Sequence, residues 1–131
     1  MMTRMKINTM NWTTILIIAG VVAAFLLVAK GGQISAKDAA TYLKNGALVI
    51  DVRSSAEFSS GHLTNAINIP LDEITNGVPQ RVKDKSQVLL LHCQSGMRSG
   101  VAQKKLTSLG YTNTFNLGSY SRAESILKQA R

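Results

Sequence analysis

Residues 93–99 have the clearest potential for chemistry in this chain. They read Cys-Gln-Ser-Gly-Met-Arg-Ser, and Cys93 is the only cysteine among the 131 residues. A thiolate is a strong nucleophile, and the pKa of a thiol falls from about 8.5 when backbone N–H groups, a helix N-terminus or an arginine surround it. Ser95 and Gly96 are small enough for the backbone to curl around the sulfur, and Arg98 adds a positive charge. The pattern predicts a nucleophile and an anion cradle in one loop.

A lone cysteine at the end of a strand is, by itself, more typical of a small buried hydrophobic residue. The position of Cys93 favours chemistry instead, because residues 88–92 predict a buried strand and a helix is predicted from Ser99. Open α/β sheets bind their ligands at the carboxyl ends of the strands. A single cysteine also excludes a disulfide framework and a cysteine-based zinc site within one chain. We expect neither a metal nor a cofactor.

Strand and helix patterns alternate on both sides of this loop. The apolar runs 47–50 and 88–92 are typical of strands that are buried on both faces of a parallel sheet. We therefore predict an α/β fold with a central parallel sheet, right-handed crossovers and helices on both faces. Residues 79–85 are polar and are expected to be exposed. The predicted strands are 47–50, 66–69, 88–92 and 112–117, and the predicted helical segments are 35–44, 54–60, 71–74, 99–109 and 122–129.

The N-terminal segment differs in composition from the rest of the chain. Residues 7–29 carry no charge, and a helix rising 1.5 Å per residue over 12–29 approaches the ~30 Å of a bilayer core. We predict a tail at 1–11, a transmembrane helix at 12–29, a linker at 30–34 and a domain at 35–131. A cleaved signal peptide is the alternative, although Lys30 directly after the apolar run fits a cleavage site poorly. A helix buried in a soluble domain is the third interpretation.

The charge balance of the chain is basic, with 15 Lys plus Arg against 7 Asp plus Glu and a formal net charge of +8. A basic surface suits small anionic substrates, an anionic membrane surface or nucleic acid. The basic residues are scattered, and no aromatic side chains interleave with them, so we expect no nucleic-acid partner. The roughly 100 residues after position 30 allow one compact domain and exclude a separate dinucleotide-binding domain.

Motifs in both halves of the domain, over residues 33–118, resemble those of single-domain rhodanese-type sulfurtransferases. Residues 93–99 resemble the active-site loop of that family, and 93–118 are most similar to the small phage-shock-type thiosulfate sulfurtransferases of the bacterial periplasm. The chain departs from many relatives after the last strand, where it has Gly118-Ser119-Tyr120 in place of Gly-Gly and a tryptophan. The first-half motifs are Asp51-Val52-Arg53, Glu57-Phe58, Gly61-His62-Leu63 and Ala66-Ile67-Asn68-Ile69-Pro70.

The resemblance implies a rhodanese-like fold and sulfurtransferase activity. The Cys93 thiolate would attack the outer sulfur of a small anionic donor such as thiosulfate, release sulfite and carry the sulfur as a persulfide to a thiol or cyanide acceptor. Arg98 would hold the oxyanion end of the donor, and a salt bridge in the first turn of the helix is the alternative for this residue. The other loop residues assigned to substrate binding are Gln94, Ser95, Gly96, Met97 and Ser99.

Residues outside the loop are expected to support it. The resemblance places Asp51 and Arg53 near the loop, where a buried pair is favoured over direct proton transfer. His62 is assigned to the same supporting group, and a neutral histidine that bonds to the backbone at a helix end is favoured over a general base. His92 points to the opposite face from Cys93 if the strand continues, so a Cys-His pair is not expected.

Two other functions stay open at this stage. A Cys-dependent phosphatase of the same fold is disfavoured because four residues separate Cys93 from Arg98, whereas the phosphatase relatives have five. A non-catalytic, membrane-tethered persulfide carrier or docking module is the second, and the short linker would keep a membrane-bound protein partner close. We expect a single-pass protein of the bacterial inner membrane. Resemblance to periplasmic relatives favours a domain facing the periplasm, although the flanking charges nearly balance.

Overall fold

The computed structural model describes residues 11–30 and 32–131, with the side chains of 25–30 left out. The chain divides into two compact units, Met1–Gly31 and Gly32–Arg131. The predicted tail at 1–11 lies outside the described residues except for its last position. All the residues with predicted chemistry belong to the second unit, so the fold of that unit alone positions the site.

The first unit contains helix α1 (Trp12–Lys30), which covers the predicted helix at 12–29. Among the residues that the structure describes, no helix is long and apolar enough to cross a membrane. The predicted transmembrane helix is therefore not supported by the described structure.

The second unit is built on a four-stranded sheet in the order β2-β1-β3-β4, with every neighbouring pair parallel. Its strands are β1 (Leu48–Asp51), β2 (Ile67–Asn68), β3 (Leu89–His92) and β4 (Thr114–Gly118). All four residues of β3 are buried, as expected for a central strand covered on both faces. The predicted parallel sheet is confirmed, and the strand predicted at 66–69 is reduced to two paired residues.

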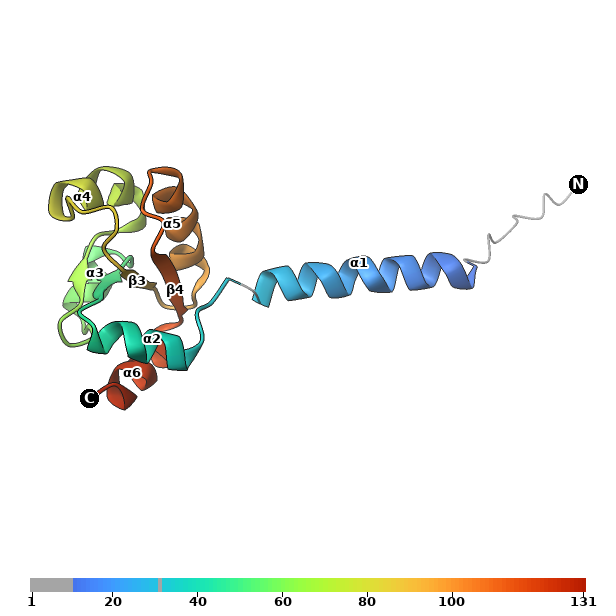
Figure 1. Ribbon diagram of the computed structural model, residues 1–131, viewed down its shortest axis with the longest axis horizontal. Helices are drawn as coiled ribbons and strands as arrows, with labels where there is room; N and C mark the ends of the chain where they lie inside the picture. The colour runs from blue at the N-terminus through green and yellow to red at the C-terminus, as the bar shows by residue number, and fades with distance from the viewer. Residues whose placement is uncertain (1–10, 31) are drawn as a thin grey trace, which may run out of the picture. The chain divides into compact units, whose positions relative to one another are not determined.

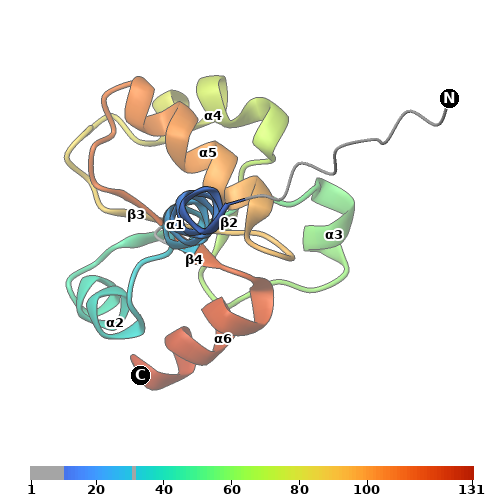
Figure 2. The ribbon, with the colours of Figure 1, turned by 90° about the vertical axis from the view of Figure 1, so that its right-hand side faces the viewer.

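Helices cover both faces of this sheet, as predicted (Figures 1 and 2). One face carries α2 (Ala36–Lys44) and α6 (Tyr120–Gln129), and the other carries α4 (Ile74–Arg81) and α5 (Met97–Ser108). Alternate residues of β3 point to the two faces: Leu90 packs in the cluster under α2 and α6, while Leu89 and Leu91 pack in the cluster under α4 and α5. The remaining helical segments are α3 (Ser55–Ser59) and the 3₁₀ turn η1 (Leu71–Glu73).

Serine caps begin three of the helices. Ser35 Oγ accepts the Asp38 N–H at the start of α2, and Ser54 forms a complete capping box with Glu57 at the start of α3. Both starts follow from the Ser-x-x-acidic pattern. The last helix begins at Tyr120, two residues earlier than predicted, because Ser119 accepts the Arg122 N–H at 3.2 Å.

Most of residues 79–85 are exposed, as predicted, with Val82 as the buried exception, but the helix that contains Pro79 was not predicted. Helix α4 runs to Arg81 with Pro79 inside it, and Val78 and Val82 are buried. The buried positions 74, 78 and 82 keep the spacing of a helix face, which the proline obscured in the sequence. Gly77 lets α4 approach the sheet closely, since a Cβ there would lie 2.7 Å from the Ile69 side chain.

Helix α5 buries only some of its apolar residues. Ala102 and Leu106 are fully buried, whereas Val101 and Leu109 are 46% and 36% exposed. The buried positions of α5 are Ser99, Ala102 and Leu106. A polar residue thus occupies a core position at the start of this helix, directly beside Cys93.

Candidate active site

Cys93 directly follows β3 at the carboxyl end of the sheet, and its side chain is fully buried. Its Sγ lies 3.0 Å from the Gly96 backbone nitrogen and 3.6 Å from the Ser99 hydroxyl oxygen. Burial by itself would raise the pKa of the Cys93 thiol. Hydrogen bonds from the Ser99 hydroxyl and from the backbone N–H groups of Ser99, Gly96 and Ser95 outweigh burial and hold that pKa below its ordinary value. The arrangement favours a thiolate inside a ring of donors.

The loop keeps this curvature because of Gly96. Its φ of +94° lies in the left-handed region, and a Cβ at this position would lie 3.1 Å from the Gly118 Cα. An L side chain therefore meets both an unfavourable backbone conformation and a neighbouring backbone. The Gly96 N–H donates to the sulfur at 3.0 Å, so the glycine permits the close approach on which the anion cradle depends.

The junction of β4 and α6 holds the other side of the loop. The Cys93 N–H donates to the Gly118 carbonyl at 3.3 Å, and the Tyr120 N–H donates to the Gln94 carbonyl at 3.3 Å. Ser95 and Ser119 form an isolated antiparallel bridge. These backbone contacts fix the loop against the last strand, which lies next to β3 in the sheet.

Asn116 of β4 also holds the loop, and the sequence analysis missed it. Its Oδ1 accepts the Ser99 hydroxyl at 2.7 Å and the Gly118 N–H at 2.8 Å, and its Nδ2 donates to the Gly96 carbonyl at 3.1 Å. The available signal was an amide side chain in β4, a strand in which four of the five residues are buried. Buried polar groups in such positions are normally hydrogen-bonded, and here the partners belong to the cysteine loop.

Arg98 is paired with Glu57 of α3. Its two terminal nitrogens lie 2.7 and 3.0 Å from the two carboxylate oxygens, and both side chains are 36% exposed. The hydrogen bond from Arg98 lowers the pKa of Glu57 to about 2, and Glu57 in turn raises the pKa of Arg98, with a smaller contribution from Cys93. The salt bridge considered as the alternative for Arg98 is present. Contact between Arg98 and a donor oxyanion stays a prediction.

Asp51 and Arg53 form a buried pair near the loop. Arg53 Nε lies 3.0 Å from each carboxylate oxygen, and its Nη2 lies 2.8 Å from Oδ2 of Asp51 and 2.7 Å from the Gly61 carbonyl. The hydrogen bond with Asp51 raises the pKa of Arg53. The Arg53 guanidinium also lies over the Tyr120 ring, 4.8 Å from its centroid. The pair therefore reaches the loop through Tyr120, whose N–H bonds to Gln94.

The two histidines lie in different surroundings. His62 is exposed and stacks on Phe58, with 3.8 Å between the ring centroids. Its Nδ1 lies 3.0 Å from the Phe58 carbonyl oxygen, so its hydrogen bond is to α3 and not to the loop. His92 is buried edge-on against Tyr120, and its Nε2 has no hydrogen-bond partner among the described residues. Burial lowers the pKa of His92. Its ring packs toward α6, whereas Cys93 belongs to the cluster under α4 and α5.

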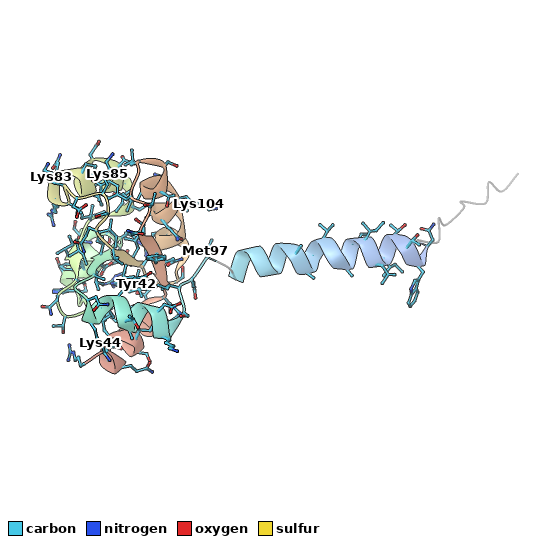
Figure 3. All side chains as sticks on the ribbon, viewed as in Figure 1. Tyr42, Lys44, Lys83, Lys85, Met97 and Lys104 are labelled. Carbon is cyan, nitrogen blue, oxygen red and sulfur yellow. The ribbon has the colours of Figure 1, made fainter. Side chains whose placement is uncertain are left out.

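The remaining predicted substrate-binding residues lie at the mouth of the loop. Gln94 and Ser95 are exposed, and Met97 is 78% exposed at the start of α5 (Figure 3). An open groove of about 350 Å³ lies beside the loop, with Arg98 and Lys105 in its lining. Substrate contacts of these residues stay predictions, because the geometry shows only their exposure around a buried sulfur.

Comparisons with known proteins agree with this geometry. A family model described as "Rhodanese-like domain" matches residues 35–123. The chain is 38% identical over 69 residues to the thiosulfate sulfurtransferase PspE of Escherichia coli, covering 53% of this chain and 66% of that protein. It is 36% identical over 80 residues to the thiosulfate:glutathione sulfurtransferase of Saccharomyces cerevisiae, covering 51% of this chain and 56% of that protein. The matches thus span less than two thirds of either relative.

Solved structures give the same result. The human single-domain sulfurtransferase TSTD1 is similar with a TM-score of 0.62 and 28% identity, over 72% of this chain and 96% of that one. A structure described as rhodanese with anions from E. coli has a TM-score of 0.57 and 34% identity, over 59% of this chain and 91% of that one.

Proposed function

The chain belongs to the rhodanese-like domain family, and we propose that it is a sulfurtransferase that passes sulfane sulfur through a persulfide on Cys93. The observation that carries the proposal is the cradle around this sulfur, in which the Gly96 N–H lies 3.0 Å from Sγ. Hydrogen bonds to the charged form lower the pKa of a thiol and equally stabilise a persulfide anion. A buried structural cysteine would not need such donors.

The proposed reaction has two displacements at sulfur. The Cys93 thiolate attacks the outer sulfur of thiosulfate, a Cys–S bond forms, and sulfite leaves with the electron pair of the broken S–S bond. A thiol or cyanide then attacks the outer sulfur of the persulfide, and the electron pair of that bond returns to Cys93 as the thiolate. The backbone donors of Ser95, Gly96 and Ser99 stabilise the negative charge in both states.

Arg98 is proposed to bind the oxyanion of the donor while it stays paired with Glu57. A guanidinium has five N–H donors, and the two contacts to Glu57 use one donor on each terminal nitrogen. Donors are thus left for a sulfonate group at the mouth of the loop. Glu57 competes for the same cation, so this carboxylate reduces the attraction of the site for anionic donors.

The test of the proposed function is mass measurement after incubation with thiosulfate. One sulfur atom should add per chain, and it should persist because the chain has no second cysteine to resolve the persulfide. Cyanide or dithiothreitol should then remove it. Cys93→Ser should add none. A matched control combines Cys93→Ser with Ser108→Cys, which places the single thiol on the exposed end of α5 outside the cradle, and this variant should load far more slowly.

Equal loading of both cysteine positions would show that the cradle has no role in sulfur transfer. Turnover that survives in Cys93→Ser, or a preference of the wild type for aryl phosphates, would contradict the proposal.

We also propose that residues 12–29 anchor the domain to the bacterial inner membrane, with the domain on the periplasmic side. The support is the sequence alone, in which residues 7–29 carry no charge and residues 12–29 are mainly aliphatic; the described part of the structure gives no support for a membrane span. A short linker would then keep the sulfur loop near a membrane-bound partner. Protease treatment of spheroplasts tests the side: digestion of the domain supports it, and protection until lysis would place the domain in the cytoplasm.

A further inference from the structure

The Asn116 side chain lies beside the sulfur loop, and the residue is only 4% exposed. Its hydrogen-bond partners fix the orientation of the amide. The Gly118 N–H can only donate and lies against Oδ1, while the Gly96 carbonyl can only accept and lies against Nδ2. Exchanging the oxygen and the nitrogen would break both bonds. The amide oxygen is therefore the atom that faces Ser99.

The Ser99 hydroxyl lies between Asn116 and Cys93. Its Oγ is 2.7 Å from Oδ1 of Asn116, 3.1 Å from the Gly96 carbonyl oxygen and 3.6 Å from Sγ of Cys93. Because Oδ1 only accepts, the contact at 2.7 Å requires the single hydroxyl proton of Ser99. While Asn116 holds this proton, Ser99 presents a lone pair toward the sulfur, an arrangement that suits a thiol. The hydroxyl bond that lowers the pKa of Cys93 requires the proton to turn from Asn116 to the sulfur.

Loss of the Cys93 proton reverses what the sulfur requires from Ser99. A thiolate is stabilised by the hydroxyl proton, and this is the proton that Asn116 also accepts. We propose that Asn116 is a positioning residue that limits the reactivity of Cys93 by competing for the hydroxyl proton of Ser99. The inference rests on the proposed sulfur transfer, since persulfide formation begins from the thiolate.

Charged groups around the sulfur do not depend on this competition. Arg98 of α5 is the cation whose pKa Cys93 raises, and Glu57 of α3 pairs with it. His92 of β3 is held toward its neutral form by burial, and β4 (Thr114–Gly118) contains no charged residue. Substitution of Asn116 or Ser99 by apolar residues leaves these charges in place. A change in Cys93 reactivity in such variants is therefore not caused by a lost charge, and the Ser99→Ala background separates the hydroxyl proton from the Gly96 backbone.

The test measures the alkylation rate of Cys93 by iodoacetamide in the full chain across a range of pH. Asn116→Leu removes the competing acceptor with little change in volume, and alkylation below the thiol pKa should become about three- to tenfold faster. Ser99→Ala should slow alkylation, and Asn116→Leu should cause no further acceleration in that background. Asn113→Leu is the matched control, because this amide bonds to the Ser86 carbonyl before β4 and should leave the rate unchanged.

Unchanged or slower alkylation in a folded Asn116→Leu variant would overturn the proposal. Acceleration that persists in the Ser99→Ala background would also overturn it, because Asn116 would then act through the Gly96 backbone. If Asn116→Leu does not fold, Asn116→Ala removes the same acceptor without adding a charge, so faster alkylation is expected and unchanged or slower alkylation refutes the idea. Sulfur loading from thiosulfate is measured separately: its absence, with the alkylation pattern intact, would refute the sulfurtransferase function alone.

Discussion

Replacement of Gly96 by alanine should damage stability and thiol reactivity together. The left-handed conformation costs an L residue about 1–2 kcal/mol. The added Cβ would also lie 3.1 and 3.2 Å from the Cα and carbonyl carbon of Gly118, and because these are backbone atoms the loop must shift at a further cost of about 1–3 kcal/mol. We expect Gly96→Ala to lower the free energy of unfolding by about 2–5 kcal/mol in urea titrations. The shift also moves the Gly96 N–H away from Sγ of Cys93, so alkylation at neutral pH should slow.

Gly46→Ala is the matched control for this experiment. Gly46 has a φ of +89°, close to that of Gly96, but a Cβ there would meet nothing within 4 Å. It should therefore cost only the conformational part, about 1–2 kcal/mol, and should leave the alkylation rate unchanged. Equal losses of stability in the two variants would show that the contact with Gly118 is relieved without cost. Wild-type alkylation in Gly96→Ala would refute the role of this N–H in the cradle.

Three further predictions concern other parts of the domain. Glu57→Gln should weaken the competition for Arg98 and lower the KM for thiosulfate by about two- to fivefold, the range of an exposed ion pair; a higher KM in steady-state assays would mean that Glu57 positions Arg98 for the donor. Because burial lowers the pKa of His92 from its ordinary 6.5, the unfolded chain gains a proton that the folded chain does not, so stability should fall as pH drops below that value. Urea titrations at about pH 7.5 and about pH 5.5 should show this loss, His92→Phe should reduce it and His62→Phe should retain it. A fragment of residues 32–131, a compact unit with its own core, should unfold cooperatively and take up sulfur as the full chain does; a fragment without a cooperative transition would show that α1 belongs to the fold.

The fold could be predicted where local and long-range signals agreed. The runs 47–50 and 88–92 became β1 and β3, because unbroken apolar segments must be covered on both faces. The sequence pattern failed at α4, where a proline and polar residues hid a helix that is held by packing against the core. Only 71–74 was predicted as helical in this region, whereas α4 runs to Arg81 with Pro79 inside it, because Ile74 and Val78 are buried on one face of this helix.

The part of the site that could be predicted from the sequence is the loop at residues 93–99. The strand, the small residues and the arginine around Cys93 are neighbours in sequence, and the donors to the sulfur come from the same segment. The partners of the loop come from elsewhere: Glu57 is 41 positions from Arg98, and Asn116 is 17 positions from Ser99. A single sequence holds no geometric information about such pairs. The alternative of a salt bridge for Arg98 was available, but its carboxylate could not be identified by spacing.

Asn116 shows why the position of this loop next to β4 matters chemically. A cradle made only of backbone N–H groups stabilises every anionic sulfur alike, and its strength is set once the loop has folded. A hydroxyl shared between Asn116 and the sulfur adds a donor whose proton turns toward Cys93 only when the thiol loses its own proton. The parallel pairing of β3 with β4 places that amide beside the end of β3. The sheet therefore contributes directly to the reactivity of Cys93, because its order determines which side chain competes for the hydroxyl proton of Ser99.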